Sequence, residues 1–258
     1  DAYSGKCIVV TASSINSTKD LVVSEGEDVV VKGNVSCNNL YVNGGTLTIC
    51  SKSTLNVIGN AVVSGGSTNW LNPISTDKCG GVLEVNGKLK VGNDLTVSEP
   101  CGILNMRNSG CSVTVMNNFL ITTNSTTYTC TLTEGTLSVG GKFEASGKYS
   151  GNFKASQNHL TVLSGNSFDV VMDKSDSHFN HLALSDEAYS SFTSGTEKEL
   201  YSANIKGRFY KLSDKNSDLT KYLSDNNPVL RQLDETYNNY MGKSDFKDNM
   251  SSLKKYVS

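Results

Sequence analysis

The chain has 258 residues and a formal net charge of −2 at pH 7, with 23 Lys and Arg against 25 Asp and Glu. Because the charges nearly balance, the net charge does not predict nucleic acid or an anionic membrane surface as a partner. The length suffices for a buried core, and no apolar run approaches the ~20 residues that a membrane-spanning helix needs. No signal peptide is visible after Asp1, so we expect a mature or shortened chain.

The first 20 residues hold one apolar run, Cys7–Val10, which is followed by Ser, Thr and Asn. An exposed strand edge invites pairing with another chain, so a repetitive β protein needs its open end covered. We therefore interpret residues 1–20 as an N-terminal cap with an entry strand.

A recurring Leu-x-Val pattern organises residues 40–139. Apolar residues two apart place two side chains on one face of a strand, and the Gly and Asn residues between the copies accept the backbone angles of tight turns. The copies are Leu40-Tyr41-Val42, Leu47-Thr48-Ile49, Leu55-Asn56-Val57, Leu83-Glu84-Val85, Leu89-Lys90-Val91, Leu95-Thr96-Val97, Leu104-Asn105-Met106 and Leu137-Ser138-Val139. Strands so short and so frequent predict a chain that coils, each turn stacking on the last.

The spacing of the pattern predicts a right-handed parallel β-helix over residues 21–185, in an all-β-dominated protein. Leu83 and Leu104 are 21 residues apart, which fits three short strands and three turns at ~3.3 Å per residue. The longer intervals from Leu47 to Leu83 and from Leu104 to Leu137 predict loop insertions near residues 67–80 and 122–133. We expect six to eight turns.

The insertions contain the residues that we single out as candidates for ligand binding. Loops that leave a rigid solenoid commonly carry binding sites, and aromatic faces stack on the apolar faces of sugars. The candidates are Trp70, Tyr128 and Tyr149. For Trp70 the alternative is that the ring folds back and covers apolar surface at the edge of the solenoid.

Seven cysteines all lie at or before position 130. None has the CxxC spacing or a neighbouring His, so a zinc site is not predicted. One interpretation is that they are small buried residues. The other is that disulfides form between successive turns in an oxidising compartment, with Cys37, Cys79 and Cys101 at one corner. The candidates for disulfides are Cys37, Cys79, Cys101, Cys111 and Cys130.

Composition changes after Leu163, where Gly becomes rare and Cys disappears. Three further strands are expected around residues 159–165, 168–172 and 179–184. Asn227-Pro228 has the form of a helix start, and helical spacing continues to Gly242; a second helix is expected over 244–257. We interpret residues 186–258 as a C-terminal strand and helical segment that caps the solenoid.

No catalytic constellation is visible in the sequence. A polysaccharide lyase needs carboxylates around Ca²⁺ and a base, and a glycoside hydrolase needs two facing carboxylates. The acidic residues of the repeats are scattered instead: Glu84, Asp94, Glu99, Glu134 and Glu144. We therefore expect no enzyme activity, no cofactor and no metal, although a β-helix lyase or hydrolase stays an alternative.

The repeats resemble those of secreted bacterial β-helix surface proteins, which read G-T-L-x-V-x-G. The resemblance rests on Gly-Gly-Thr-Leu-Thr-Ile at 44–49, Gly-Thr-Leu-Ser-Val at 135–139 and Gly-Lys-Phe-Glu-Ala-Ser-Gly at 141–147. The segments 159–165 and 177–182 are similar to the closing turn of such proteins.

The resemblance implies a function at the cell surface. Tapirins, which attach to plant polysaccharides, are the nearest functional analogy. We expect a secreted or surface-exposed adhesin that binds polysaccharide or another surface or matrix ligand, with solenoid ends open to self-association. A purely structural spacer or assembly module is the remaining alternative.

Overall fold

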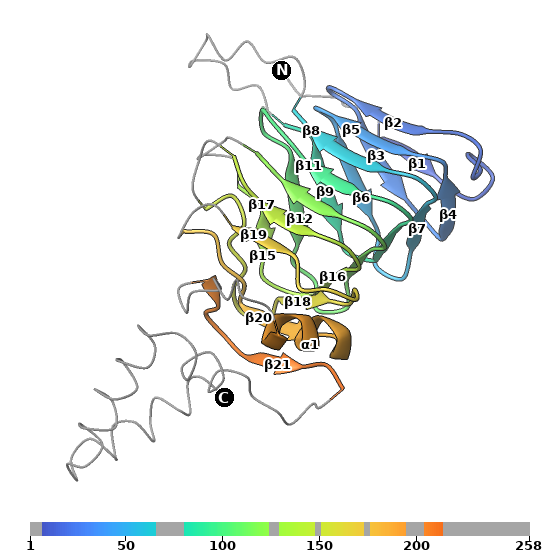
Figure 1. Cartoon of the computed structure of the whole chain (residues 1–258). Helices are drawn as coiled ribbons and strands as arrows, with labels where there is room; N and C mark the ends of the chain where they lie inside the picture. Colours follow the sequence, from blue (N-terminus) through green and yellow to red (C-terminus); the bar gives the residue numbers. More distant parts are fainter. Residues whose placement is uncertain are drawn as a thin grey trace, which may run out of the picture.

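The computed structural model describes residues 7–65, 80–123, 129–147, 151–172, 176–194 and 204–213. In this part of the chain, short strands stack into a parallel solenoid of about seven turns (Figure 1). The prediction of an all-β parallel β-helix is therefore confirmed. Three sheets run along the solenoid, and we name them A, B and C.

Through residues 21–139 each turn contributes one strand to each sheet, and all the strand pairs are parallel. Sheet A contains β1 (Cys7–Val10), β3 (Asp28–Val31), β6 (Thr46–Ile49), β9 (Val82–Val85), β12 (Ile103–Met106) and β15 (Thr131–Leu132). Sheet B contains β2 (Leu21–Ser24), β5 (Leu40–Asn43), β8 (Ala61–Ser64), β11 (Leu95–Val97), β14 (Phe119–Ile121), β17 (Phe143–Ala145) and β19 (Val170–Met172). Sheet C contains β4 (Asn34–Cys37), β7 (Thr54–Val57), β10 (Lys88–Val91), β13 (Ser112–Val115), β16 (Thr136–Val139), β18 (Leu160–Leu163), β20 (His181–Leu184) and β21 (Phe209–Lys211).

The register confirms the 21-residue turn, because Leu83 of β9 pairs with Leu104 of β12. The interval from Leu104 to Leu137 predicts that these two residues are equivalent, and this prediction is wrong. Leu137 lies in sheet C and pairs with Val113. The Leu-x-Val pattern is the same in all three sheets, so the pattern alone does not tell which sheet a copy belongs to.

Inside the solenoid, alternate residues of every strand are buried, as the period of two requires. In sheet B, one row of paired inward residues contains Leu40, Ala61, Leu95, Phe119 and Phe143, all fully buried. The side chains of this row are largest at its C-terminal end. Phe119 and Phe143 stack with ring centroids 5.3 Å apart. Further phenylalanines pack on them, so the buried aromatic rings of the described core lie in its C-terminal half, among aliphatic side chains.

A ladder of side-chain amides and carboxylates holds the edge where sheet C passes into sheet B, which we name the C–B edge. In each turn one Asp or Asn Oδ1 accepts a hydrogen bond from a backbone N–H of the next turn, over 2.9 to 3.2 Å. The acceptors are Asp20, Asn39, Asn60, Asp94 and Asn118. Backbones also approach closely here, since a Cβ on Gly92 would lie 2.1 Å from the Ile58 carbonyl oxygen.

The three edges differ in the length of their connections. Strands of sheet A connect to sheet C through two to five residues, and the first five connections from C to B have two or three. At the B–A edge, where sheet B passes into sheet A, the connection from β5 to β6 has two residues, whereas β8 to β9 has 17. Every connection between β2 and β15 that is longer than five residues therefore joins sheet B to sheet A.

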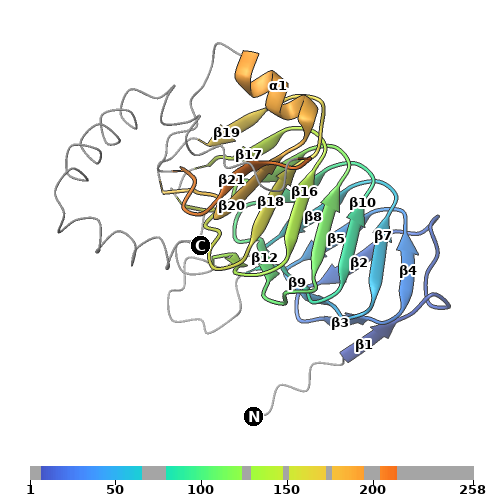
Figure 2. The same ribbon diagram turned by 90° about the horizontal axis from the view of Figure 1, so that it is seen from below.

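A short helix, α1 (Asp186–Ser194), follows β20 where a further strand of sheet B would come in the chain order. Ala188 and Phe192 of α1 are buried, and the Phe192 ring packs against Phe168 and Phe209. Both views place α1 at the end of the stack that is remote from β1 (Figures 1 and 2). With nine residues, this described helix does not meet the length needed to cross a membrane. The helices predicted over 228–241 and 244–257 lie outside the described residues.

Candidate functional site

The three aromatic residues predicted to bind sugar lie outside the described residues: Trp70, Tyr128 and Tyr149. Each belongs to a chain segment that follows a strand of sheet B and precedes the next residues of sheet A. The three candidates are therefore attached to the same edge of the solenoid, in different turns.

Described residues on both sides of these segments make hydrogen bonds at the B–A edge. The carbonyl oxygen of Ser64, at the end of β8, accepts a hydrogen bond from the Gly81 N–H over 2.8 Å. Further along, the buried Asn152 Oδ1 accepts from Ser177 Oγ over 3.1 Å, and Asn204 Nδ2 donates to the Ser177 carbonyl over 2.7 Å. Hydrogen bonds thus hold the edge near β8 and again near the C-terminal end of the solenoid.

The cysteines divide between the two interpretations given by the sequence. Cys101 is in a disulfide, and Cys79 lies outside the described residues. Cys37, Cys111 and Cys130 are free and buried, and burial raises the pKa of the Cys37 and Cys130 thiols to about 11. Buried thiols of this kind are chemically inert. Cys37 lies on β4, away from the B–A edge that holds Cys101, and its partner position on β7 is Val57.

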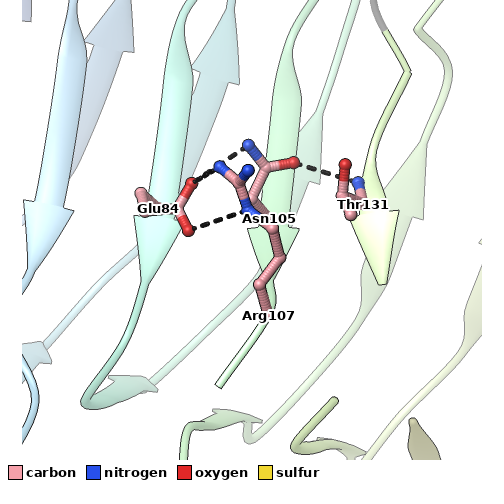
Figure 3. Close-up of polar contacts among 4 residues, drawn as sticks. All are labelled: Glu84, Asn105, Arg107 and Thr131. Carbon is pink, nitrogen blue, oxygen red and sulfur yellow. Dashed lines mark hydrogen bonds and ion pairs between the residues drawn. The ribbon is translucent and has the colours of Figure 1, made fainter. Parts of the chain in front are cut away.

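One polar cluster crosses the outer face of sheet A (Figure 3). The Arg107 guanidinium contacts the Glu84 carboxylate through two nitrogens, with Nη2 2.5 Å from Oε2 and Nε 3.2 Å from Oε1. Asn105 Nδ2 donates to the same carboxylate over 3.1 Å, and Asn105 Oδ1 accepts from the Thr131 N–H over 2.9 Å. The cluster therefore links β9, β12 and β15.

The chemistry of this cluster favours a structural role. The Glu84 carboxylate is occupied by a bidentate guanidinium, which is the strongest pairing available to it, and hydrogen bonding to Glu84 raises the pKa of Arg107. Glu84 is therefore engaged and offers no free base, and Asn105 is 92% buried.

The other carboxylates singled out in the sequence lie on different sides of the solenoid. Asp94 belongs to the hydrogen-bonded ladder at the C–B edge. Glu144 lies on the outer face of sheet B, paired with Lys142 at 2.8 Å, and Glu134 accepts from Asn158 Nδ2 near the edge between sheets A and C. Within the described ranges, none of these residues faces Glu84 across a cleft.

Three histidines lie near the C-terminal end of the solenoid. His159 is fully buried and donates from Nδ1 to the Glu134 carbonyl over 2.9 Å, while its Nε2 has no protein partner in the described structure. Burial lowers the pKa of His159. It also lowers the pKa of His181, which is less completely buried. The His181 Nδ1 accepts from the Arg208 N–H over 3.0 Å. No group of three or more metal-binding side chains occurs among the described residues.

The outer face of sheet C is the most regular polar surface of the described part. Figure 2 shows its strands side by side, from blue β4 to yellow β18. In five successive strands every outward position is Ser, Thr, Asn or Lys, and over ~4.8 Å per strand this face is about 19 Å long. The ten residues, which we name the C face, are Asn34, Ser36, Thr54, Asn56, Lys88, Lys90, Ser112, Thr114, Thr136 and Ser138.

Most side chains of the C face make no hydrogen bond within the described structure. Among the described residues only Ser138 of the ten makes a side-chain hydrogen bond, to Ser164 Oγ over 3.2 Å. Beyond β16 the outward positions change to Leu160 and Val162, so the polar face ends there. The Leu-x-Val pattern predicts only the inward Leu and Val side chains; the signal of this face is the Ser, Thr, Asn or Lys residue between them.

Comparison with known proteins finds no matching family model, no matching curated protein and no matching solved structure.

Proposed function

We propose that this chain is a non-catalytic binding module of an extracellular surface, an adhesin that attaches to polysaccharide or another surface ligand. The observation that supports the proposal best is the C face. Hydroxyl and amide groups both donate and accept hydrogen bonds, so a rigid row of them suits a ligand that repeats its own hydroxyl groups. The disulfide of Cys101 supports an oxidising, extracellular location.

The aromatic candidates add a second contact region to this proposal. Trp70, Tyr128 and Tyr149 belong to segments anchored at the B–A edge, on a different side of the solenoid from the C face. Stacking of their rings on sugar would supply apolar area that the C face lacks.

The arrangement of carboxylates supports binding over catalysis. Hydrolysis of a glycosidic bond uses two carboxyl groups separated by about 5 to 9.5 Å across the substrate. In the described part, Glu84 is held by Arg107, Asp94 by the C–B edge ladder, and Glu144 by Lys142. An enzyme would have to use other groups.

The test is a pull-down of the whole chain with insoluble polysaccharides, run with Trp70→Ala, Tyr128→Ala and the double variant Thr114→Val/Thr136→Val. The valine substitutions keep the β-branched shape and remove two hydroxyls of the C face. Each lost hydrogen bond is worth about 0.5–1.5 kcal/mol, so we expect roughly tenfold weaker binding.

Thr96→Val is the matched control, because Thr96 occupies an outward position on sheet B. It should bind like the unmodified chain. Weaker binding by the aromatic variants alone would place the contact at the B–A edge segments. Failure of the unmodified chain to bind any surface would contradict the adhesin proposal and favour a structural spacer.

A further inference from the structure

The lysines of the described structure are unevenly placed around the solenoid. Lys88 and Lys90 project from the centre of the C face, and Lys32 and Lys52 lie on the adjoining edge, between sheets A and C, in the two preceding turns. All four side chains belong to exposed residues. The three consecutive turns that contain β4, β7 and β10 thus present four ammonium groups on one side of a chain with a net charge of −2.

These four lysines have no acidic partner in the described part of the chain. The ion pairs found there use Arg107, Lys142 and Lys211. No Asp or Glu occupies an outward position of β4, β7, β10, β13 or β16. Their positive charge is therefore available to a ligand.

The positive groups stand within an array of neutral polar side chains. Lys88 lies between Thr54 and Ser112 of the neighbouring strands, and Lys90 lies between Asn56 and Thr114. A ligand that meets the lysines would meet hydroxyl and amide groups on both sides, at the strand spacing of ~4.8 Å. The array combines attraction for negative charge with hydrogen bonding to uncharged oxygen atoms.

We propose that the C face and its lysine edge bind an anionic polysaccharide, one that carries carboxylate or sulfate groups along a chain rich in hydroxyls. This inference rests on the proposed function and names its ligand class. An acidic polysaccharide offers the lysines a repeating negative charge and offers the Ser, Thr and Asn side chains a partner at each sugar. Single-stranded nucleic acid fits less well, because the C face has no aromatic side chain on which a base could stack.

The test measures binding of the whole chain to four soluble polymers: polygalacturonate, dextran sulfate, neutral dextran and double-stranded DNA. Affinity is determined by calorimetry or affinity electrophoresis at two salt concentrations. The variant is Lys88→Gln/Lys90→Gln. The matched control is Lys154→Gln/Lys206→Gln, which makes the same change in net charge at exposed residues on or beside sheet A.

We expect the unmodified chain to bind at least one of the two acidic polysaccharides and to bind more weakly at higher salt, since exposed charges are screened. Lys88→Gln/Lys90→Gln should weaken this binding by about tenfold and reduce its salt dependence, while the control stays within about twofold. Preference for polygalacturonate or for dextran sulfate would identify the carboxylate or the sulfate as the group bound. Unchanged circular dichroism and melting temperature would show that both variants are folded.

Four results would overturn the inference. Equal loss in the variant and the control would mean that only net charge matters, and equal binding of DNA would remove the preference for sugar. Binding of neutral but not acidic polysaccharide would overturn this inference while leaving the adhesin proposal in place, whereas binding to no polysaccharide at all, soluble or insoluble, would contradict both.

Discussion

Asn118 is a single residue that joins three turns of the solenoid, through its backbone N–H and its side chain. Its backbone N–H donates to Asp94 Oδ1 in the preceding turn, and its own Oδ1 accepts from the Lys142 N–H in the next, over 2.9 Å each. Because the side chain is partly buried, its removal takes away an acceptor that water replaces poorly. We expect Asn118→Ala to lower the free energy of unfolding by about 1–2 kcal/mol, as measured by urea denaturation.

Asn93→Ala is the control for this prediction, since Asn93 lies at the same edge, is exposed and makes no side-chain hydrogen bond among the described residues. Its effect should stay within about 0.5 kcal/mol. Equal effects of the two substitutions would mean that the ladder does not stabilise the edge.

His159 makes the stability of the fold sensitive to pH. Burial lowers its pKa below the ordinary value of 6.5, with smaller effects from its neighbours. Below pH 6.5 the unfolded chain therefore binds a proton that the folded chain excludes, and the free energy of unfolding decreases as the pH falls, until the folded pKa is reached. Urea denaturation between pH 7.5 and pH 5 should show this decrease.

His159→Gln should reduce that pH dependence. Burial also lowers the pKa of His181, so the part of the slope that comes from His181 should remain. A full slope in His159→Gln would show that the buried imidazole is not its source.

Single residues also show what the sequence could reveal. The Leu and Val positions predicted the inward side chains because burial follows the strand period. The ladder at the C–B edge was missed, although its signal is present: an Asp or Asn stands directly before the first inward residue of sheet B. The pairs are Asp20-Leu21, Asn39-Leu40, Asn60-Ala61, Asp94-Leu95 and Asn118-Phe119.

Among the strands, β17 carries the centre of the aromatic core. The Phe143 ring lies 5.3 Å from that of Phe119, 4.9 Å from Phe153 and 4.8 Å from Phe179. Phe143→Ala would leave a cavity bordered by three turns, so we expect a loss of about 3–5 kcal/mol in the free energy of unfolding. Leu120→Ala, an outward position on the neighbouring strand β14, should cost much less; a similar cost for both would contradict this account of the core.

Elements near the C-terminal end were harder to predict than the repeats. The sequence predicts strands around residues 159–165, 168–172 and 179–184, and β18, β19 and β20 lie within these ranges. The helix α1 was not placed by the sequence reasoning. Its signal is local: Ser185 Oγ accepts from the Ala188 N–H over 3.0 Å, as an N-cap does, and Asp186 and Glu187 follow in the first turn.

For the whole molecule, the solenoid predicts a graded stability. Each turn packs mainly on its two neighbours, so the end turns have one neighbour and the central turns two. We expect amide hydrogen exchange to be slowest in β7, β10 and β13 and fastest in β1 and β21. Uniform protection from end to end would show instead that the solenoid opens only as a unit.

At this scale the sequence predicted the architecture well and the candidate site poorly. A 21-residue period follows from the geometry of three short strands, so repetition alone leads to stacked turns. The C face is formed by the residues between the repeating Leu and Val positions, and these residues vary among Ser, Thr, Asn and Lys from turn to turn. A surface of this kind becomes visible only when the register brings those residues side by side.

The B–A edge has a practical consequence for engineering. Ser64 and Gly81 are joined by a backbone hydrogen bond although 16 residues separate them in the chain, so the ends of that connection already meet. Lengthening a connection whose ends meet costs little additional loop entropy. A peptide tag or a small folded domain inserted between residues 65 and 80 should therefore leave the strand register intact, and the protein could serve as a rigid scaffold for display.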